Sequence, residues 1–288
     1  MRVGHVRELW RYPVKSLRGE RLPRAAIERR YGVAGDRGWA VREEQVGEIR
    51  SAKRVGALVE FAARYVEEPC GAWVPPVEID LGDRGTVRSD HPELAAKLSD
   101  ALGFAASLWP RQPADDTDFY RRVDPIDEAE MRRQLALLPD EPIPTYATTP
   151  PELAAELREY VSPLGTFFDA VELHLLSTSS LTALGEHAPE SDLDVRRFRP
   201  NIVVDTRELS GFVEHAWVGR RLRIGPVIAD VTMPTSRCVM VTLPQADLPR
   251  DRSIMRTLVR ATGMDLGVGL AVIEPGTVAI GDPIELVD

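Results

Sequence analysis

The sequence is poor in cysteine and has no long apolar run. Its two cysteines, Cys70 and Cys238, stand far apart among 288 residues, which does not suggest the disulfide framework of a small secreted domain. No stretch reaches the roughly 18 consecutive apolar residues that span a bilayer, and the first residues lack the apolar core of a signal peptide. We therefore expect a protein of the reducing cytoplasm that does not cross a membrane.

The motifs of common nucleotide and metal enzymes are also missing. The sequence has no GxGxxG after a strand, no P-loop, no HExxH, no EF-hand and no CxxC. Its five histidines are scattered, with no pair at ligand spacing. These absences argue against a Rossmann dehydrogenase, a nucleotide-dependent kinase and a zinc hydrolase. The net charge of −9 argues against nucleic-acid binding, because an acidic surface repels phosphate backbones.

What is present is an ordinary globular composition, 43% hydrophobic and 28% charged, long enough to bury a substantial core. Turn residues and alternating apolar residues predict short strands at 3–11, 24–30, 39–42, 57–66, 73–81, 171–176, 201–204, 227–231, 239–243 and 268–273, with two more in the tail. Helical periodicity and capping residues predict helices at 91–102, 128–138, 151–161, 177–184 and 251–262. Many short strands with few helices indicate an α+β fold that is rich in β-barrel structure.

The composition changes between about residues 110 and 151, where proline, aspartate, glutamate and threonine are frequent. Such a stretch is typical of an inter-domain connection, and equally of a variable surface insertion without function. We expect a smaller domain at 1–120, a connection at 121–150 and a second domain at 151–288.

Cys238 lies in TSRCVMVTL, after a polar turn and at the start of an apolar run. A thiol at a loop-to-strand edge can face a cleft, and Arg237 beside it favours the thiolate, the form that ligates metals. The ordinary alternative is a small buried hydrophobe, as most free cysteines are. The local sequence leaves both interpretations open.

Two N-terminal segments, RYPVKS at 11–16 and GDRGW at 35–39, place basic side chains at the end of a strand and in a turn. Lys15 is one of only three lysines in an arginine-rich chain and follows a proline-stiffened strand. Arg37 offers a planar fork that suits a phosphate. A solvated edge strand and an ordinary turn are the alternatives.

Two segments of the second half offer further hydrogen-bond donors. In LHLLSTSS an apolar strand runs into hydroxyls that open a helix, which suits either an anion site or plain N-capping by Ser177. In RRFRPNIVV, Arg199 and Asn201 can present donors to a phosphate or to the edge of a heterocycle. A salt-bridged surface turn is the alternative there.

Together these segments resemble the MOSC family, the molybdenum cofactor sulfurase C-terminal domain proteins, with the N-terminal β-barrel domain that often accompanies them. YPVKS and GDRGW resemble the N-terminal region. FRPNIVV, the W-x-G-R-x-L-R-I-G stretch at 217–225, SRCVMVT and the PG…GD close at 275–282 resemble the MOSC domain. The similarity runs in order over nearly the whole chain and is weakest between about 66 and 149.

The resemblance implies a MOSC domain, a smaller N-terminal β-barrel-like domain, and a molybdopterin-type molybdenum cofactor in a cleft to which the N-terminal strands contribute. It places the metal-bonding and catalytic thiolate at Cys238, whereas Cys70 matches nothing in the family. The cofactor-binding residues that it implies are Lys15, Ser16, Arg37, Ser177 or nearby Ser179, Arg199, Asn201 and Arg237.

The functional relatives within this family, the amidoxime-reducing component and its bacterial counterparts, imply a molybdenum-dependent oxidoreductase that reduces N-hydroxylated compounds. The chain begins at its first strand without the anchor of the eukaryotic relatives, and it has no cysteines for the iron–sulfur cluster of some bacterial relatives. We therefore expect a small-molecule substrate and a separate electron donor, a ferredoxin-, flavodoxin- or cytochrome b5-like protein. Two alternatives stay open: a carrier of the cofactor or of sulfur without turnover, and a metal-free barrel with Cys238 in its core.

Overall fold

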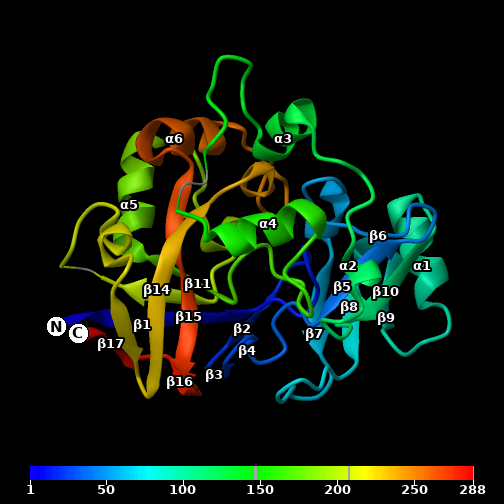
Figure 1. The fold of residues 1–288 in the computed structure, drawn as a ribbon, viewed down its shortest axis with the longest axis horizontal. Coiled ribbons are helices and arrows are strands. Elements are labelled where there is room, and N and C mark those ends of the chain that lie inside the picture. The colour runs from blue at the N-terminus through cyan, green and yellow to red at the C-terminus, as the bar shows by residue number, and fades with distance from the viewer. Residues whose placement is uncertain (146–147, 207, 288) are drawn as a thin grey trace.

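A closed barrel dominates the computed structural model, which describes residues 1–145, 148–206 and 208–287 (Figure 1). Neighbouring strands follow the order β12-β11-β15-β14-β13-β17-β1, and the pairing of β1 with β12 closes the barrel, while β2 extends β1. These strands are β1 (Arg2–Arg11), β2 (Glu20–Leu22), β11 (Leu173–Ser177), β12 (Ile202–Asp205), β13 (Arg221–Ile224), β14 (Val227–Ser236), β15 (Asp265–Glu274) and β17 (Pro283–Val287).

The first strand contributes apolar side chains to the barrel core at an unusual spacing. A regular strand points every second side chain inward, but β1 buries Val3, Val6 and Leu9. The register of β1 shifts between Arg2 and Gly4 against β17, and between Val6 and Glu8 against β12. Each bulge adds one residue to the repeat, so the N-terminal strand completes a barrel that is otherwise built from the second half of the chain.

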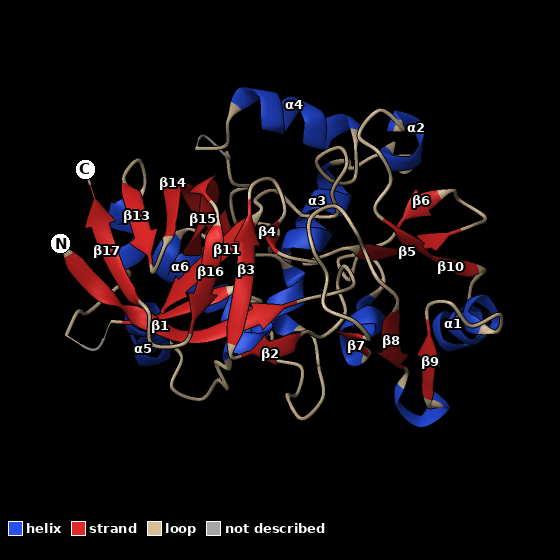
Figure 2. Cartoon of the chain, turned by 90° about the horizontal axis from the view of Figure 1, so that it is seen from below, coloured by secondary structure: helices blue, strands red, loops and turns tan. Residues whose placement is uncertain are grey.

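Three small sheets lie beside the barrel, two of them on the side away from the chain termini (Figure 2), and one of the three includes a strand from the C-terminal tail. The three sheets have the strand orders β10-β5-β6, β16-β3-β4 and β7-β8-β9. Their strands are β3 (Arg24–Glu28), β4 (Gly32–Val33), β5 (Trp39–Glu43), β6 (Glu48–Ile49), β7 (Ala62–Tyr65), β8 (Val77–Asp80), β9 (Thr86–Arg88), β10 (Ala106–Pro110) and β16 (Gly276–Ala279).

Helices pack against strands of the barrel and against strands of the N-terminal sheets. The α-helices are α1 (Leu94–Leu102), α2 (Thr117–Tyr120), α3 (Glu128–Leu135), α4 (Pro151–Glu159), α5 (Thr178–His187) and α6 (Ser253–Thr262). Short 3₁₀ helices are η1 (Gly56–Glu60), η2 (Gly82–Arg84), η3 (Val195–Arg197), η4 (Val213–Trp217) and η5 (Val239–Thr242). The α+β, barrel-rich fold expected from the sequence is confirmed.

Capping residues set the ends of two helices as the sequence predicts. Ser177 precedes α5, and its Oγ accepts a hydrogen bond from the Ser180 N–H at 3.0 Å. Gly263 follows α6 in the left-handed conformation, with φ 63°. The strand leading into α5 therefore ends abruptly, and the helix begins next to the barrel wall.

The predicted strand at 239–243 is wrong, because this segment forms η5. Its backbone turns on itself, with Val241 N–H donating to Cys238 O and Leu243 N–H to Met240 O, both at 3.2 Å. The turn lets Met240 and Leu243 enter the core of the N-terminal sheets while Val241 enters the core under α5 and α6. An extended strand at 239–243 could not place its side chains in both of these cores.

The predicted strands at 57–66 and 73–81 are only partly right. Residues 56–60 form η1, and β7 begins at Ala62. The second segment becomes a strand only at Val77, because Pro75 and Pro76 lack the N–H groups that a sheet requires.

The segment predicted as a connection, residues 121–150, contains α3 and lies against the rest of the protein. Leu135 of α3 is buried in the core beneath α6, and the preceding Tyr120 packs on Phe167 with ring centroids 5.8 Å apart. The predicted domain boundaries stay a prediction, and residues 146 and 147 of this segment, like 207 and 288 of the predicted second domain, lie outside the described residues.

Candidate functional site

Lys15 and Ser16 lie between the N-terminal sheets and the barrel. The Lys15 ammonium is buried and donates to Phe167 O at 2.8 Å and to the Asp169 carboxylate at 3.0 Å. Burial lowers the pKa of Lys15, and Asp169 partly offsets this effect. Ser16 has φ 71°, and its Oγ accepts the Ala52 N–H at 2.9 Å.

Asp36 connects the two N-terminal motifs to the barrel. Its fully buried carboxylate accepts Tyr12 N–H at 2.7 Å and Asn201 Nδ2 at 2.9 Å, and it forms an ion pair with Arg37. The Asn201 amide also donates to Trp10 O at 3.3 Å. Because one carboxylate joins three chain segments, it holds Arg37 and Tyr12 in place.

Arg37 and Arg199 both lie over the Tyr12 ring, with their guanidinium carbons 4.7 and 4.2 Å from its centroid. One guanidinium nitrogen of Arg199 donates to Leu17 O at 2.6 Å. Burial, with Arg37 as a like charge nearby, lowers the pKa of Arg199 to about 10. The energetic cost of two neighbouring buried cations indicates a place where an anion is expected.

Arg237 and Cys238 approach the same cluster from the end of β14. Arg237 donates from Nη2 to Phe198 O at 2.6 Å, and burial lowers its pKa. Cys238 is partly exposed and packs against both the core of the N-terminal sheets and the core under α5 and α6. The thiol therefore lies at the boundary between the two cores, and it is not enclosed within either.

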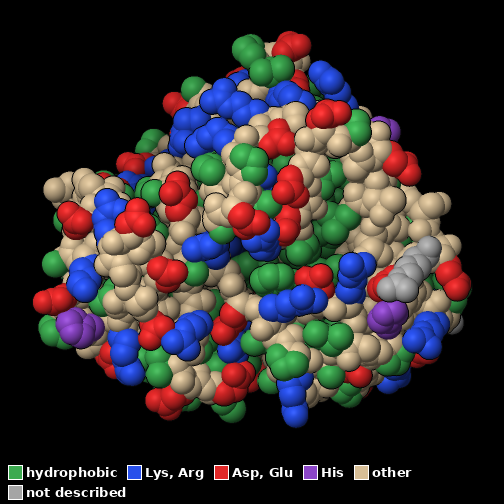
Figure 3. Space-filling model, turned by 180° about the vertical axis from the view of Figure 1, so that it is seen from behind, with side chains coloured by type: hydrophobic (Ala, Val, Ile, Leu, Met, Phe, Trp, Pro, Cys, Tyr) green, Lys and Arg blue, Asp and Glu red, His purple; other side chains and the backbone are tan. Residues whose placement is uncertain are grey.

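The cluster is strongly cationic. Asp169 attracts Lys15, Arg199 and Arg237, and Arg37 repels them, so these side chains lie within electrostatic range of one another. The carboxylates of Asp36 and Asp169 are outnumbered by five basic side chains, namely Lys15, Arg37, Lys53, Arg199 and Arg237. The chain as a whole carries −9, and basic and acidic side chains are intermixed over the back face of the molecule (Figure 3). A local excess of positive charge in an acidic protein favours a bound anion such as a phosphate.

Two buried donors of the cluster have no hydrogen-bond partner. Among the described residues, nine buried side-chain nitrogen or oxygen atoms make no hydrogen bond, and Arg199 Nη2 and Arg237 Nε are two of them. Each such atom costs about 1–3 kcal/mol. A group with several hydrogen-bonding atoms, bound here, would remove this cost, so the residues present suit a ligand with a phosphate and a polar ring.

Three residues of the cluster have strained backbone, among seven described non-glycine residues with positive φ. Ser16, Arg37 and Arg199 adopt positive φ angles of 71°, 45° and 54°. L-residues other than glycine rarely adopt this region, and such conformations concentrate at binding sites where the surroundings hold them.

Ser177 and Ser179 are engaged elsewhere. The Ser177 hydroxyl donates to the buried Glu214 carboxylate of η4 at 2.5 Å and lies 3.0 Å from Ser179 Oγ. Ser180 Oγ donates to the same carboxylate at 2.6 Å. The role of Ser177 and Ser179 in cofactor binding stays a prediction, since the hydrogen bonds of their hydroxyls join them to one another, to Glu214 and to the start of α5.

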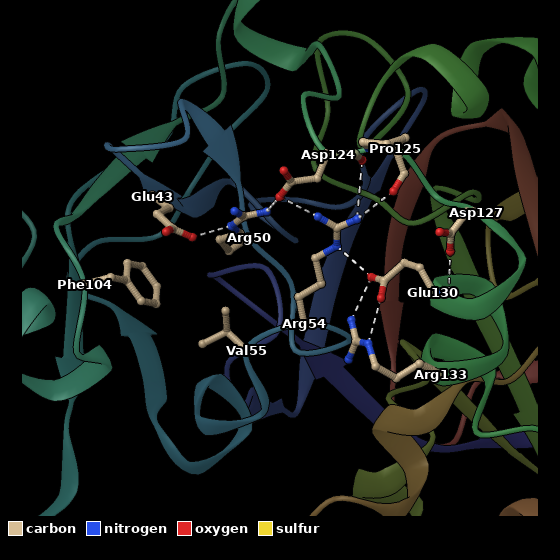
Figure 4. Close-up of a pocket in the computed structure, with 10 residues that line it drawn as sticks. All are labelled: Glu43, Arg50, Arg54, Val55, Phe104, Asp124, Pro125, Asp127, Glu130 and Arg133. Carbon is tan, nitrogen blue, oxygen red and sulfur yellow. Dashed lines mark hydrogen bonds and ion pairs between the residues drawn. The ribbon is translucent and has the colours of Figure 1, made fainter.

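A cavity of about 190 Å³ borders the cluster at Tyr12 and Arg199 and also touches Arg18 and Gln245. A larger cavity, of about 520 Å³, lies beside residues 124–133 of the segment that was predicted to be a connection (Figure 4). There Arg50 and Arg54 share the carboxylate of Asp124, and Arg54 and Arg133 bind Glu130. These guanidinium groups are paired with carboxylates, so we assign the site to the smaller cavity and its surroundings.

Sequence analysis missed Tyr12, Asp36 and Asp169. Tyr12 and Asp36 belong to the two motifs that drew attention to Lys15 and Arg37, so the motifs themselves could have indicated them. Asp169 stands in an unremarkable FFDAVE segment and becomes relevant only through its contact with Lys15.

Two protein-family models match the chain. The MOSC N-terminal beta barrel domain model matches residues 3–91, and the MOSC domain model matches residues 166–285. The chain belongs to the MOSC family. Both groups of cluster residues fall inside the matched regions of this MOSC protein, Lys15 and Arg37 in the first, Arg199 and Cys238 in the second.

Relatives that match almost the whole of this chain are named amidoxime-reducing components. The MOSC protein is 24% identical to human mitochondrial amidoxime-reducing component 1 over 325 residues, which covers 99% of this chain and 83% of the relative. It is 26% identical to bovine mitochondrial amidoxime reducing component 2, over 98% of this chain and 83% of the relative.

Solved structures also resemble the MOSC protein. The YUAD protein from Bacillus subtilis matches with a TM-score of 0.43 and 10% identity over 98% of this chain and 94% of that one. YiiM from Geobacillus stearothermophilus matches with a TM-score of 0.31 and 15% identity over 41% and 55%. In the part of the chain that the structure describes, no helix combines the length and the apolar character that a membrane crossing needs.

Proposed function

We propose that this protein is a cytoplasmic oxidoreductase that binds a molybdopterin-type molybdenum cofactor and reduces N-hydroxylated compounds with electrons from a separate protein. The observation that carries the proposal is the cationic cluster with unpartnered donors on Arg199 and Arg237, next to the partly exposed thiol of Cys238. The cluster provides for a phosphate and a polar ring, and the thiol provides a soft ligand for a metal.

The family and the named relatives support the choice of ligand. MOSC domains are found in molybdenum cofactor proteins, and the full-length relatives are named for the reduction of amidoximes. Because the identity is 24–26%, the choice of substrate class rests on this name together with the site. We include hydroxamic acids and N-hydroxylated bases, which share the N–O bond.

Each member of the cluster has a role that follows from its chemistry. Lys15 and Arg37 neutralise the cofactor's phosphate, and the Arg37 fork is held by Asp36 for that purpose. Arg199 and Arg237 donate to the polar ring, Ser16 supplies a hydroxyl and Asn201 fixes the position of Asp36. Cys238 provides the protein's ligand to the metal.

When bound, the cofactor supplies the two-electron redox chemistry that removes oxygen from the N–O bond. The chain's own contribution is to bind the cofactor, to orient it and to shield it from water. Buried Lys15 and Arg199 keep their charges close to the bound group in surroundings with little water, where each electrostatic contact is stronger than at the surface. The separate electron donor is expected to be a ferredoxin-, flavodoxin- or cytochrome b5-like protein.

The proposal is tested by replacing Cys238 with alanine, with Cys70→Ala as the matched control because Cys70 is an exposed thiol elsewhere in the chain. Both variants are purified from a host that makes the cofactor. Their molybdenum and pterin contents are measured, together with benzamidoxime reduction driven by an artificial electron donor. We expect Cys238→Ala to lose at least about tenfold in molybdenum content or activity, and Cys70→Ala to match the wild type.

Unchanged metal content and activity in Cys238→Ala would rule the proposal out. Stoichiometric cofactor in the wild type without turnover of any N-hydroxylated compound would favour the carrier function. A wild type without molybdenum, even after growth with molybdate, would leave a metal-free binding barrel.

A further inference from the structure

The cavity of about 190 Å³ beside the cluster is lined by basic and polar side chains and by no carboxylate of the described residues. Arg18, Arg196, Arg199 and Gln245 face it, and the rings of Trp10 and Tyr12 form part of its wall. The larger cavity differs, because four carboxylates stand there among three guanidinium groups. A recess in which only positive charge lines the wall favours an anion.

Two of the three guanidinium groups in this wall have no carboxylate partner. Arg196 forms ion pairs with Asp194 at 2.8 Å and with Asp247 at 2.7 Å. Arg18 and Arg199 form no ion pair with the described residues, and the Arg18 side chain makes no hydrogen bond to them either. One nitrogen of Arg199 donates to a backbone carbonyl. Both groups therefore have N–H donors left for a ligand.

The backbone holds these two arginines in place. Arg18 N–H donates to Phe61 O at 2.8 Å, and Ala63 N–H donates to Arg18 O at 3.2 Å, so both sides of residue 18 are bonded to the start of β7. Arg199 donates to the carbonyl of the preceding Leu17 at 2.6 Å. A site whose donors are fixed before the ligand arrives loses less conformational freedom on binding.

Gln245 adds an amide to the same wall. Its side chain is only 5% exposed, and its backbone N–H and C=O are both bonded to Leu248, at 3.0 and 2.9 Å. The side-chain amide makes no hydrogen bond to the described residues, yet its atoms are not among the nine buried ones without a partner. The amide therefore keeps some exposure, and the open space that the side chain borders is this cavity.

We propose that this cavity binds an oxyanion, the carboxylate or phosphate group of a small molecule, through Arg18, Arg199 and Gln245. A guanidinium group matches either anion with two parallel N–H donors, and the amide of Gln245 supplies another donor. At roughly 30 Å³ for each water molecule, the cavity has room for about six, which is enough for one such group and a few carbon atoms.

The anion belongs either to a substrate or to the cofactor, because Tyr12 and Arg199 are shared between the cavity and the cationic cluster. Both sources present the same chemistry to the cavity wall, and the experiment separates them. The existence of the site does not depend on the proposed function, since it can be measured on the full-length chain without the cofactor.

The test measures the binding of inorganic phosphate and of benzoate to the cofactor-free chain by isothermal titration calorimetry. The variants are Arg18→Gln and Gln245→Leu. Arg24→Gln is the matched control, because Arg24 is an exposed arginine of β3 that does not line the cavity, and its loss changes the net charge equally. The buffer contains about 0.1 M salt, which largely screens charges more than about 10 Å apart. Urea unfolding shows whether each variant is folded.

We expect the wild type to bind at least one of the two probes saturably, and Arg18→Gln to bind it about tenfold more weakly, as the loss of a charge-assisted hydrogen bond predicts. Gln245→Leu should bind roughly three- to tenfold more weakly, as the loss of a neutral hydrogen bond predicts. The affinity of Arg24→Gln should stay within about twofold of the wild type. Arg18 is partly exposed, so its variant decides the test if Gln245→Leu does not fold.

Three results would overturn this inference. The first is a wild type that binds neither probe saturably. The second is an Arg18→Gln variant that binds both probes as well as the wild type does. The third is an equal loss of affinity in Arg24→Gln, which would mark a general effect of charge.

The protein purified from a host that makes the cofactor then identifies the source of the anion. If the anion belongs to a substrate, this wild type still binds benzoate, and Arg18→Gln raises the KM for para-carboxybenzamidoxime more than that for benzamidoxime. If the anion is the cofactor's phosphate, the loaded protein no longer binds either probe, and Arg18→Gln loses molybdenum and pterin faster on dialysis. A wild type without molybdenum would refute the proposed function and leave the oxyanion site, measured on the cofactor-free chain, intact.

Discussion

Asp36 shows how a single buried side chain arranges a binding site. Its carboxylate accepts from Tyr12, Asn201 and Arg37, which come from three separate segments. A buried charge is tolerated only when it is paired and hydrogen-bonded. Here the requirement also fixes the Tyr12 ring on which Arg37 and Arg199 lie, so the positions of the cations follow from how one carboxylate is satisfied.

Asp169 gives a pH-dependent prediction at the residue scale. Lys15 and Lys53 outweigh the effect of burial and hold the pKa of Asp169 well below 3.8. A carboxyl with a lowered folded-state pKa stabilises the protein above its unfolded-state value, and this contribution is lost as the pH falls through the folded-state value. Since the Asp169 side chain is 55% exposed, we expect Asp169→Asn to lower the free energy of unfolding by about 1 kcal/mol at pH 7.

The difference between Asp169→Asn and the wild type should stay constant from pH 7 to about 4 and then shrink towards zero at lower pH. Urea unfolding measured at several pH values would show this. Asp118→Asn, at a position 90% exposed, serves as the control and should follow the wild type throughout. A difference that grows on acidification would contradict the assigned sign.

Two neighbouring elements, α6 and β15, illustrate how a glycine serves different purposes. Gly263 ends α6 with φ 63° and has nothing within 4 Å of where a Cβ would be. Gly267 in β15 has φ +81° and would place a Cβ against His174 and Leu175. The first glycine is needed only for its backbone conformation, and the second also for its lack of volume.

We therefore expect Gly263→Ala to cost about 1 kcal/mol in unfolding free energy and Gly267→Ala to cost at least about 3 kcal/mol, since overpacking is added to the strain. Denaturant unfolding of the two variants measures both values. Equal costs would show that the wall beside His174 can move aside, contrary to the close packing described.

At the scale of the whole molecule, the barrel depends on both ends of the chain. β1 pairs with β12 on one side and β17 on the other, and β16 of the tail pairs with β3. The C-terminal half alone would leave β12 and β17 as open edges, and unpaired edges with an apolar face favour aggregation.

We expect residues 151–288 expressed alone to lack a cooperative urea transition and a fixed near-UV circular dichroism signal. Co-expression with residues 1–150 should restore both, because it returns β1 to the barrel. A fragment 151–288 that unfolds cooperatively on its own would show that β1 is dispensable and would favour two independent domains.

The sequence by itself determined most of the local structure and indicated part of the candidate site. The apolar residues of β14 and β15, the cap at Ser177 and the glycine after α6 act over a few residues, so they could be recognised from the local sequence. The motifs around Lys15, Arg37, Arg199 and Cys238 likewise stand out in the linear chain.

Only the tertiary structure decided what these residues meet. The segment after Cys238 becomes η5 and not a strand because two separate cores compete for its side chains. Asp169 joins the cluster through Lys15, which is far away in the sequence. Burial, pairing and the lack of a partner at Arg199 and Arg237 depend on how the barrel packs against the N-terminal sheets, and no local pattern carries that information.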